Sequence, residues 1–427
     1  MSNRTKTTAE LVPKLRFPDF RGAGAWQPIT LQEASTPVAA RVGEKKLTPV
    51  SISAGIGFVP QAEKFGRDIS GNQYQIYTLV KDGDFVFNKG NSLKFPQGCV
   101  YLLQGWGQVA APNVFICFRL KDGYSNDFFQ NCFEQNQHGR QLKRHITSGA
   151  RSNGLLNISK ETFFGIEIPT PAPAEQQKIA ECLSSVGELI AAQALRVDVL
   201  KTHKKGLMQQ LFPREGETQP RLRFPKFKNA GEWVVKRLEE IGRVIRGASP
   251  RPKGDPCYYG GPIPRLMVQD VTRDGKWVTP RIDSLTEEGA KLSRPCPAGT
   301  LTIVCSGAVG VVSFLAVDAC IHDGFLALVE IDESLASKEF LYHRLSTLRE
   351  QFDKGATHGG VFTNLTTTGV DQLEIACPGH DEQQRIAACL SSLDALITAE
   401  TRKLEALKTH KKGLMQQLFP STERVTA

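Results

Sequence analysis

The chain lacks several features that mark common protein classes. Its ten cysteines include no Cys-x-x-Cys pair, so we expect neither a zinc site nor a disulfide framework, as is typical of a reducing cytoplasm. No apolar run approaches the roughly 20 residues that span a bilayer. The N-terminal MSNRTKTTAE contains no apolar signal segment. We therefore expect a cytoplasmic protein with no metal site and no membrane partner.

The sequence also lacks the motifs of enzymes that modify or translocate nucleic acids. Amino-methyltransferases hold a flipped base with an Asn/Asp-Pro-Pro-Tyr/Phe turn, and the nearest match, DPCY at 255–258, has no second proline. The isolated GIG at 55–57 is a weak signal, and the absence of a Gly-x-x-x-x-Gly-Lys-Ser/Thr loop excludes a P-loop motor. We predict no catalytic residue and no cofactor in this chain.

Charge is not balanced. The chain has 53 Lys and Arg against 44 Asp and Glu, a formal net charge of +9. This favours a polyanionic partner such as nucleic acid, although many basic proteins bind nothing acidic. A hydrophobic content of 40% is ordinary for a globular protein, and 427 residues suffice for two or three domains.

A long segment of the chain is repeated. Residues 175–213 read EQQKIAECLSSVGELIAAQALRVDVLKTHKKGLMQQLFP, and residues 382–420 match them at an offset of 207, with 26 of 39 positions identical. PKLRFPDFRGAGAW at 13–26 matches PRLRFPKFKNAGEW at 220–233 at the same offset. The sequence therefore predicts a tandem duplication with pseudo-two-fold symmetry.

The segments between the repeated pieces are different. Residues 27–156 and 234–363 look unlike each other, although NIS at 157–159 still matches NLT at 364–366. Both read as mixed α/β regions with short strands and glycine-rich turns. The repeated segments keep the same spacing in both halves, while the residues between them are free to differ.

Each 39-residue repeat is predicted to be a helix with a coiled-coil seam. Prolines precede the expected helices at 171, 173 and 378, and others mark their ends at 213 and 420. Packing against a globular core is the alternative for any single stripe, but two matching stripes favour mutual pairing. The apolar positions are Ile179, Leu183, Val186, Ile190, Val197, Leu200, Leu207 and Leu211, then Ile386, Leu390, Leu393, Ile397, Leu404, Leu407, Leu414 and Leu418.

Connectivity predicts how the helices are oriented. Only a short segment separates the first helix from the second variable region, so the second helix must begin where the first ends. The helices should run antiparallel over about 55 Å, and the polar seam positions Gln193 and Glu400 should meet near the middle. We predict an α+β fold in four parts: residues 1–170, 171–213, 214–377 and 378–427.

The repeated ends of the helices indicate a surface for a partner. Packing requires only seam positions, yet LKTHKKGLMQQLFP is identical in both copies. A shared interface would bind two copies of one partner, whereas a solvated basic face is the alternative. The candidates are Lys201, Lys204, Lys205, Gln209 and Gln210, with Lys408, Lys411, Lys412, Gln416 and Gln417.

The first variable region contains a basic stretch without an acid. Residues 73–92 read as a strand, an Asp-Gly turn, a second strand and a polar loop. The basic stretch, QHGRQLKRHITSGARSNG at 137–154, is interpreted as a loop suited to phosphate contacts or guanine readout. Solvated loop charge is the alternative. The candidates for DNA binding are Arg140, Lys143, Arg144 and Arg151.

The second variable region begins with another basic stretch. GRVIRGASPRPKGD at 242–255 is interpreted as a loop stiffened by two prolines, with Arg246, Arg251 and Lys253 as candidate DNA ligands. Later segments are rich in glycine, which allows the backbone to approach a ligand closely. A structural role is the alternative for each histidine there. The candidates for hydrogen bonds to DNA are Gln269, Ser306, His322 and His358.

The repeated motifs resemble the conserved regions of Type I restriction-modification specificity subunits over the whole chain. GIGFVPQAEKF at 55–65 and GDFVFNKGNS resemble one subtype of target recognition domain, and GASPRP, CSGAVG and IHDGF resemble another. The resemblance implies two target recognition domains separated by the antiparallel coiled coil, each reading one part of a split, asymmetric site in double-stranded DNA.

The resemblance also implies partners. Two copies of a modification methyltransferase subunit, which carries S-adenosylmethionine, would dock on the coiled coil, and restriction/translocase subunits would add ATP- and Mg-dependent translocation and cleavage. Base contacts vary too much within the family to be carried over. Two alternatives stay open: a self-contained DNA methyltransferase or nuclease, which cofactor crosslinking would reveal, and a coiled-coil scaffold that does not bind DNA.

Overall fold

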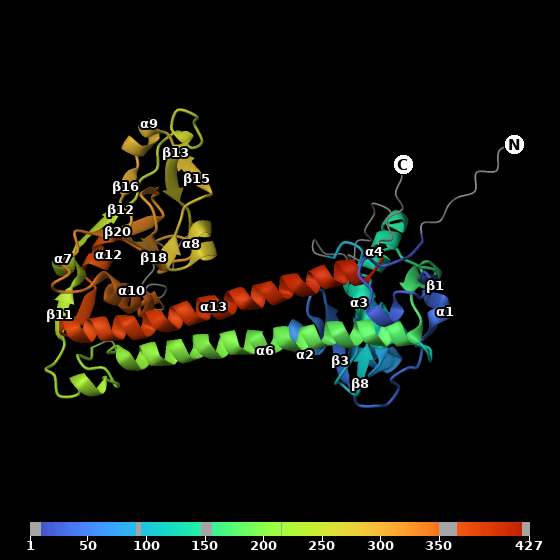
Figure 1. Cartoon of the computed structure of the whole chain (residues 1–427). Coiled ribbons are helices and arrows are strands. Elements are labelled where there is room, and N and C mark those ends of the chain that lie inside the picture. The colour runs from blue at the N-terminus through green and yellow to red at the C-terminus, as the bar shows by residue number, and fades with distance from the viewer. Residues whose placement is uncertain (1–9, 91–94, 147–155, 215, 350–364, 421–427) are drawn as a thin grey trace. The chain divides into compact units, whose positions relative to one another are not determined.

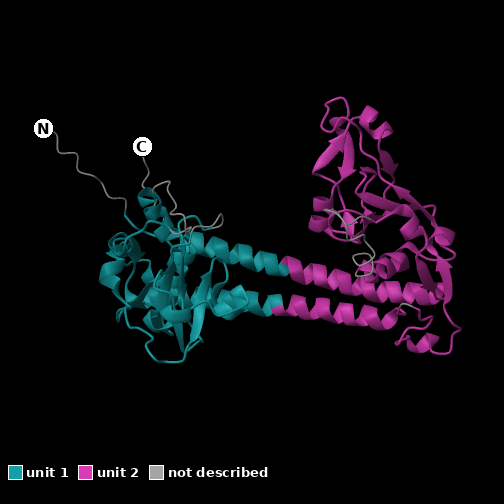
Figure 2. Ribbon diagram, turned by 180° about the vertical axis from the view of Figure 1, so that it is seen from behind, with its two compact units in different colours: residues 1–194, 403–427 teal, residues 195–402 magenta. Residues whose placement is uncertain are grey.

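The chain forms two compact units (Figure 2). Unit 1 comprises residues 1–194 and 403–427, and unit 2 comprises residues 195–402. The computed structural model describes residues 10–90, 95–146, 156–214, 216–349 and 365–420. Both unit boundaries fall within long helices, so each unit contains one part of each helix. The predicted four-part division stays a prediction.

Two long helices form where the sequence repeats (Figure 1): α6 (Pro173–Leu211) and α13 (His380–Leu418). α6 begins at its proline, whose missing N–H has no helical partner at that position in any case. The predicted seam residues are buried or half-buried, whereas Leu195 and Val199 on another face of α6 are exposed. The apolar stripe therefore faces inward, as expected.

The helices run antiparallel within unit 2. Arg196 Nη2 lies 2.9 Å from Glu400 Oε1, and Lys204 Nζ lies 2.5 Å from Asp394 Oδ1. Residue numbers rise along α6 while those of their partners fall along α13, which defines the direction. The predicted meeting of Gln193 with Glu400 would join the two units and stays a prediction.

Each unit contains a small frame that ties the start of its long helix to the chain before it. In unit 1, β1 (Gln27–Thr30) pairs antiparallel with β10 (Glu167–Thr170). In unit 2, β11 (Val234–Arg237) pairs with β21 (Glu374–Cys377) in the same way. β1 and β11, like β10 and β21, are related by the offset of 207, so the two halves of the chain form the same pair of strands although β1 and β11 differ in sequence.

An ion pair between a half-buried arginine and a buried glutamate stabilises each frame. Arg16 donates to both carboxylate oxygens of Glu175 at 2.7 Å, and Arg223 donates to those of Glu382 at 2.9 and 2.5 Å. Both glutamates lie at the start of a long helix, where the helix dipole favours a negative charge. The carboxylates in turn raise the pKa of Arg16 and Arg223 through these hydrogen bonds.

The described residues of the variable region of unit 1 form two sheets. Its first sheet has the order β2 (Ser35–Pro37), β9 (Ile116–Leu120), β6 (Asp84–Asn88), β7 (Cys99–Leu102). Its second sheet has the order β4 (Gly57–Pro60), β3 (Thr48–Ser53), β8 (Gln108–Ala111), β5 (Thr78–Lys81). The strands expected on either side of the Asp-Gly turn are present as β5 and β6, but they belong to different sheets.

The variable region of unit 2, as far as the structure describes it, also forms two sheets. The first has the order β12 (Arg243–Arg246), β20 (Phe325–Val329), β17 (Leu301–Val304), β18 (Val312–Leu315), β14 (Trp277–Val278). The second has the order β15 (Asp283–Leu285), β13 (Tyr259–Leu266), β19 (Ala319–Ile321), β16 (Arg294–Cys296).

The two variable regions share one topology. In the second sheets, β3 pairs parallel with β8 as β13 pairs parallel with β19, and the other pairs are antiparallel in both. The first sheets correspond in the order β2-β9-β6-β7 and β12-β20-β17-β18. Unit 2 adds β14, which pairs with β18. Regions that look unlike in sequence therefore have the same arrangement of strands.

Shorter helices cover and connect these sheets. In unit 1 they are α1 (Leu31–Ala34), α2 (Gln61–Phe65), α3 (Asn126–Glu134), α4 (Gln137–Leu142) and α5 (Lys160–Phe164), with 3-10 turns at Pro18–Phe20, Gly71–Ile76 and Lys143–His145. In unit 2 they are α7 (Leu238–Ile241), α8 (Val268–Asp274), α9 (Glu287–Lys291), α10 (Lys338–Thr347) and α12 (Thr367–Asp371), with a 3-10 turn at Pro225–Phe227.

The hydrophobic core of each unit includes the C-terminal end of a long helix. In unit 1, Phe419 packs against Trp26 and Phe128, with ring centroids 5.9 and 5.3 Å apart. In unit 2, Phe212 packs against Phe340 at 5.6 Å. Within the described ranges, no helix is long and apolar enough to cross a membrane. The same residues contain no group of three or more His, Cys, Asp or Glu side chains placed to hold a metal ion.

Candidate DNA interface

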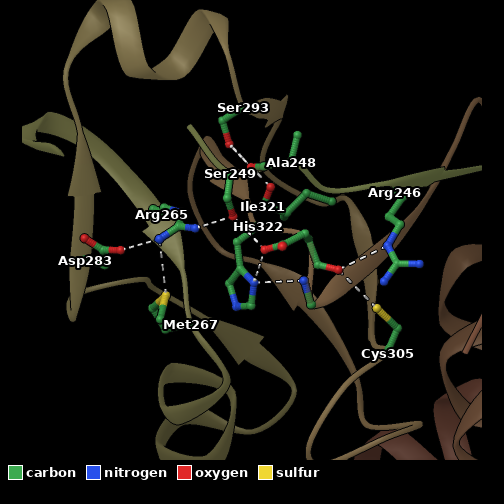
Figure 3. Close-up of polar contacts among 12 residues, drawn as sticks. Arg246, Ala248, Ser249, Arg265, Met267, Asp283, Ser293, Cys305, Ile321 and His322 are labelled. Carbon is green, nitrogen blue, oxygen red and sulfur yellow. Dashed lines mark hydrogen bonds and ion pairs between the residues drawn. The ribbon is translucent and has the colours of Figure 1, made fainter. Parts of the chain in front are cut away.

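A polar cluster in unit 2 contains Arg246 and His322, two of the predicted DNA-binding residues (Figure 3). It is centred on Asp323, in the turn that follows β19, and we call it the Asp323 cluster. Arg246 at the end of β12 donates from Nε to the Asp323 carbonyl at 3.2 Å, and Arg251 Nη2 lies 3.8 Å from its carboxylate. Arg246 and Arg251 therefore converge on one turn.

Ser249 connects this turn to the second sheet. Its hydroxyl donates to Asp323 Oδ1 at 2.6 Å and accepts from Arg265 Nη2 at 2.6 Å. Arg265, on β13, is 5% exposed and also donates to Asp283 Oδ2 at 2.5 Å. A buried guanidinium needs such partners because its desolvation is costly. The loop that contains Ser249 is thus held by charged groups on two sides.

The cluster shifts two protonation equilibria. The Ser249 hydroxyl, followed by the nearby His322, lowers the pKa of Asp323. Burial, and secondly the positive charge of Arg265, lowers the pKa of His322. The Gly324 N–H donates to His322 Nδ1 at 2.8 Å, so the neutral ring bears its hydrogen on Nε2. Asp323 is therefore charged and His322 neutral near pH 7.

The other predicted residues of unit 2 lie at different places. Ser306 is close to this turn, because a Cβ built on Gly324 would lie 2.9 Å from Ser306 Oγ. Lys253 is exposed in the loop after β12, and Gln269 is exposed on α8. His358 lies outside the described residues. The expectation of a loop throughout 242–255 was wrong at its start, since residues 243–246 form strand β12 paired with β20.

The basic stretch of unit 1 is also not a simple loop. Arg140 lies on α4, and Lys143 and Arg144 lie in the 3-10 turn that follows. The loop interpretation missed this helix because buried residues, among them Leu142, anchor it by packing. All three cations are exposed. Arg151 lies outside the described residues.

α4 is attached to the frame of unit 1. The Gln141 amide donates to the Glu167 carbonyl at 2.7 Å and accepts from the Glu167 N–H at 2.9 Å. His138 on the same helix is 2% exposed, and burial lowers its pKa to about 4. Its ring packs edge-on against Phe87 and Phe133. This histidine has a structural role, while the cations beside it face solvent.

Comparison with known proteins identifies the family of the chain. A family model described as the Type I restriction modification DNA specificity domain matches residues 70–201 and 230–409. Together these stretches cover more than half of the chain. This chain belongs to that family.

Relatives are named as specificity subunits. The chain is 28% identical over 192 residues to the Type I restriction enzyme MjaIX specificity subunit of Methanocaldococcus jannaschii, covering 44% of each chain. It is 28% identical over 283 residues to a putative MjaX specificity subunit from the same organism, covering 64% of this chain and 63% of that one. The alignments thus span about half to two thirds of these relatives.

A solved structure has a similar fold. The S subunit of a Type-I restriction-modification system from M. genitalium superposes with a TM-score of 0.57 at 14% identity, covering 97% of this chain and all of that one. At this identity the likeness shows a shared fold. A member of the specificity-domain family can keep its architecture while most side chains change.

Some of the lysines at the repeated helix ends form ion pairs within the chain. Lys204 is bound to Asp394, Lys411 Nζ lies 3.9 Å from Glu134, and Lys408 Nζ lies 2.8 Å from Glu405. The other predicted partner residues are exposed: Lys201, Lys205, Gln209, Gln210, Lys412, Gln416 and Gln417. These three lysines have partners within the chain, and their part in a partner-binding surface stays a prediction.

Core packing explains more of the repeated run than the seam alone. Met208 and Phe212 pack into the core of unit 2, and Met415 and Phe419 into that of unit 1. None of these four was a predicted seam position. Part of the identity between the two copies therefore reflects two similar cores rather than an interface.

Sequence reasoning missed Ser249, Arg265 and Asp323. Arg265 offered a usable signal, because it stands in the strand-like run YGGPIPRLMV and a buried arginine requires nearby acids. Ser249 and Asp323 lie far apart in the sequence, and nothing in their immediate context indicates the hydrogen bond that joins them.

Proposed function

We propose that this chain is the DNA-specificity subunit of a Type I restriction-modification complex. Each variable region reads one part of a split, asymmetric site in double-stranded DNA. The observation that carries this proposal is the shared topology of the two regions, which present different loops on the same pattern of sheets. Two homologous readers with different loops are suited to two different half-sites.

We further propose that α6 and α13, products of a tandem duplication, form an antiparallel coiled coil that holds the two target recognition domains apart. Burial of the seam residues supports this, as do the ion pairs of Arg196 with Glu400 and Lys204 with Asp394. The duplicated helix ends then offer equivalent surfaces to two copies of a modification methyltransferase subunit.

In this proposal the chain is not catalytic and works in the cytoplasm. The modification subunits hold S-adenosylmethionine, and restriction/translocase subunits use ATP and Mg. Support comes from the sequence, which contains no complete methyltransferase turn and no P-loop.

The test uses the full chain together with its modification subunits, S-adenosylmethionine and genomic DNA. Mapping of methylated adenines should reveal one bipartite motif, and exchanging residues 27–156 for those of a related subunit should change one half of it. Robust methylation or cleavage by the purified chain alone would overturn the non-catalytic assignment. A change in both halves would overturn the assignment of one region to each half-site.

A further inference from the structure

The loop at residues 38–47 of unit 1 occupies the same place as the basic loop of unit 2. Loop 38–47 joins β2 to β3, and residues 247–258 join β12 to β13. Each connects the edge strand of the first sheet to the second sheet. We propose that loop 38–47 binds the DNA phosphate backbone in the first half of the recognition site. This rests on the proposed function and assigns residues to it.

The two loops leave the first sheet through the same contact. The Val38 N–H donates to the Cys117 carbonyl in β9 at 2.9 Å, and the Gly247 N–H donates to the Phe325 carbonyl in β20 at 3.0 Å. β9 and β20 occupy the same position in their sheets. The correspondence therefore rests on matched backbone contacts and does not depend on sequence likeness.

The charge of loop 38–47 suits a polyanion. The sequence VAARVGEKKL has three cations, Arg41, Lys45 and Lys46, against one acid, Glu44. All three cations are exposed, and no ion pair within the described part of the chain involves them. Exposed cations that are not neutralised can exchange their counterions for phosphates, which is the main source of non-specific affinity for DNA.

Loop 38–47 is also held in place. The Tyr74 hydroxyl accepts from the Leu47 N–H at 2.6 Å and donates toward the Lys45 carbonyl at 2.7 Å. Backbone hydrogen bonds join residues 40–43 to the segment around β5, including the Val42 N–H to the Tyr77 carbonyl at 2.9 Å. A loop ordered before binding loses less entropy on binding.

A tyrosine has the same role in unit 2. The Tyr259 hydroxyl donates to the Pro250 carbonyl at 2.8 Å, in the loop that carries Arg251 and Lys253. The two tyrosines come from different elements, since Tyr74 lies in the 3-10 turn Gly71–Ile76 and Tyr259 begins β13. In each unit a tyrosine hydroxyl therefore holds the basic loop, although the two tyrosines are not equivalent in sequence.

Loop 38–47 is distinct from the basic stretch predicted from the sequence. Arg140, Lys143 and Arg144 lie on or beside α4, which Gln141 ties to the frame strand β10. Loop 38–47 instead lies along the second sheet, where the backbone of Arg41 forms an antiparallel β-bridge with that of Thr78 in β5. The corresponding place in unit 2 is the Asp323 cluster. We therefore assign the phosphate contacts to the loop.

The test measures how salt affects DNA binding by the complex of the full chain with its modification subunits. The probe is a duplex that contains the motif found by methylation mapping. The variant combines Arg41→Gln, Lys45→Gln and Lys46→Gln. A matched control, Lys14→Gln with Arg21→Gln and Lys160→Gln, removes the same charge from exposed positions of unit 1 outside the loop.

We expect the loop variant to make the slope of log affinity against log salt less steep by about 0.9 for each phosphate that the loop no longer neutralises. The control should keep the wild-type slope, and both should keep the wild-type melting temperature, because the substituted side chains are exposed. A smaller slope in the loop variant alone supports the inference.

Two results would overturn the inference: a wild-type slope in the loop variant, or an equal decrease of slope in the control. In either case site-specific methylation by the wild-type complex would leave the proposed function intact. A wild-type complex with neither salt-dependent DNA binding nor bipartite methylation would instead remove the proposed function itself.

Discussion

Unit 1 and unit 2 match at some places by residue and at others only by topology. The polar contacts of the frame match by residue. Gln176 and Gln383 both donate to a proline carbonyl at 2.9 Å. Both also accept, at 2.9 Å, from the backbone N–H of a serine that caps an earlier helix, Ser125 before α3 or Ser337 before α10. The sheets match only by topology, and the loops between them differ in residue and length.

The comparison shows which contacts need particular side chains. A buried glutamate or glutamine must meet its partner at hydrogen-bond distance, so a change at either end leaves an unsatisfied group. A strand needs only an apolar side chain of suitable size facing the core. Different sequences can therefore build the same two sheets on one frame, and the loops are free to carry different contacts.

The largest expected effect tests whether the two frames are equivalent. Glu175→Ala in unit 1 and Glu382→Ala in unit 2 each leave a half-buried arginine without its carboxylate partner. We expect each to destabilise its own unit by about 3–5 kcal/mol. Thermal unfolding with hydrogen exchange resolved by unit measures this. Destabilisation of one unit only would show that the frames are not equivalent.

Acid should weaken both units through a buried histidine in each. Burial lowers the pKa of His138 from 6.5 to about 4 and that of His343, which also faces Lys204 and Lys276, to about 2. In the unfolded chain each histidine takes up a proton near pH 6.5, so the full stability is present above that pH. Below it, the free energy of unfolding falls by up to about 1.4 kcal/mol per pH unit for each histidine, until the pH reaches the pKa of that histidine in the folded chain.

The measurement is urea unfolding of each unit between pH 7 and 4.5. His138→Gln should flatten the pH dependence of unit 1 and leave that of unit 2 unchanged. An unchanged slope in unit 1 would show that other groups cause its loss of stability in acid.

Ser249 tests how unit 2 holds its basic loop. Ser249→Ala removes the hydroxyl between Arg265 and Asp323 and should destabilise unit 2 by about 1–2 kcal/mol. DNA affinity should fall by roughly five- to tenfold with little change in salt slope, because the side chains predicted to bind phosphate, Arg251 and Lys253, remain. Ser249→Thr should restore both. Binding titrations decide this, and full affinity in the alanine variant would contradict a positioning role.

The smallest expected effect concerns a difference within the repeat. Asp394 binds Lys204 in unit 2, whereas its counterpart in unit 1 is Gly187, where an added Cβ would lie 3.7 Å from Lys411 Nζ. Gly187→Asp should stabilise unit 1 by about 0.5–1 kcal/mol, by adding an ion pair and removing a helical glycine.

The control for this substitution is Glu405→Ala, which breaks an exposed pair with Lys408 and should change stability by less than about 0.5 kcal/mol. The melting temperature of unit 1 is the readout. A destabilised Gly187→Asp variant would show that the space beside Lys411 cannot hold a carboxylate.

Sequence periodicity was enough to predict the long helices. Eight apolar positions in each copy, from Ile179 to Leu211 and from Ile386 to Leu418, form the buried side of α6 and α13. The helices begin within two residues of the predicted starts and end two residues before Pro213 and Pro420. These features are local, because a heptad stripe and a terminal proline act within a few turns of the chain.

The sequence alone determined that long segments recur at an offset of 207 and that the regions between them differ. Tertiary structure decided that these regions share one pairing of strands, that Lys204 is bound to Asp394, and that Ser249 joins Arg265 to Asp323. It also gave loop 38–47, which has no match in sequence, the same position in its unit as residues 247–258. Strand pairing and buried polar contacts join residues distant in sequence, so only the folded chain brings their partners within bonding distance.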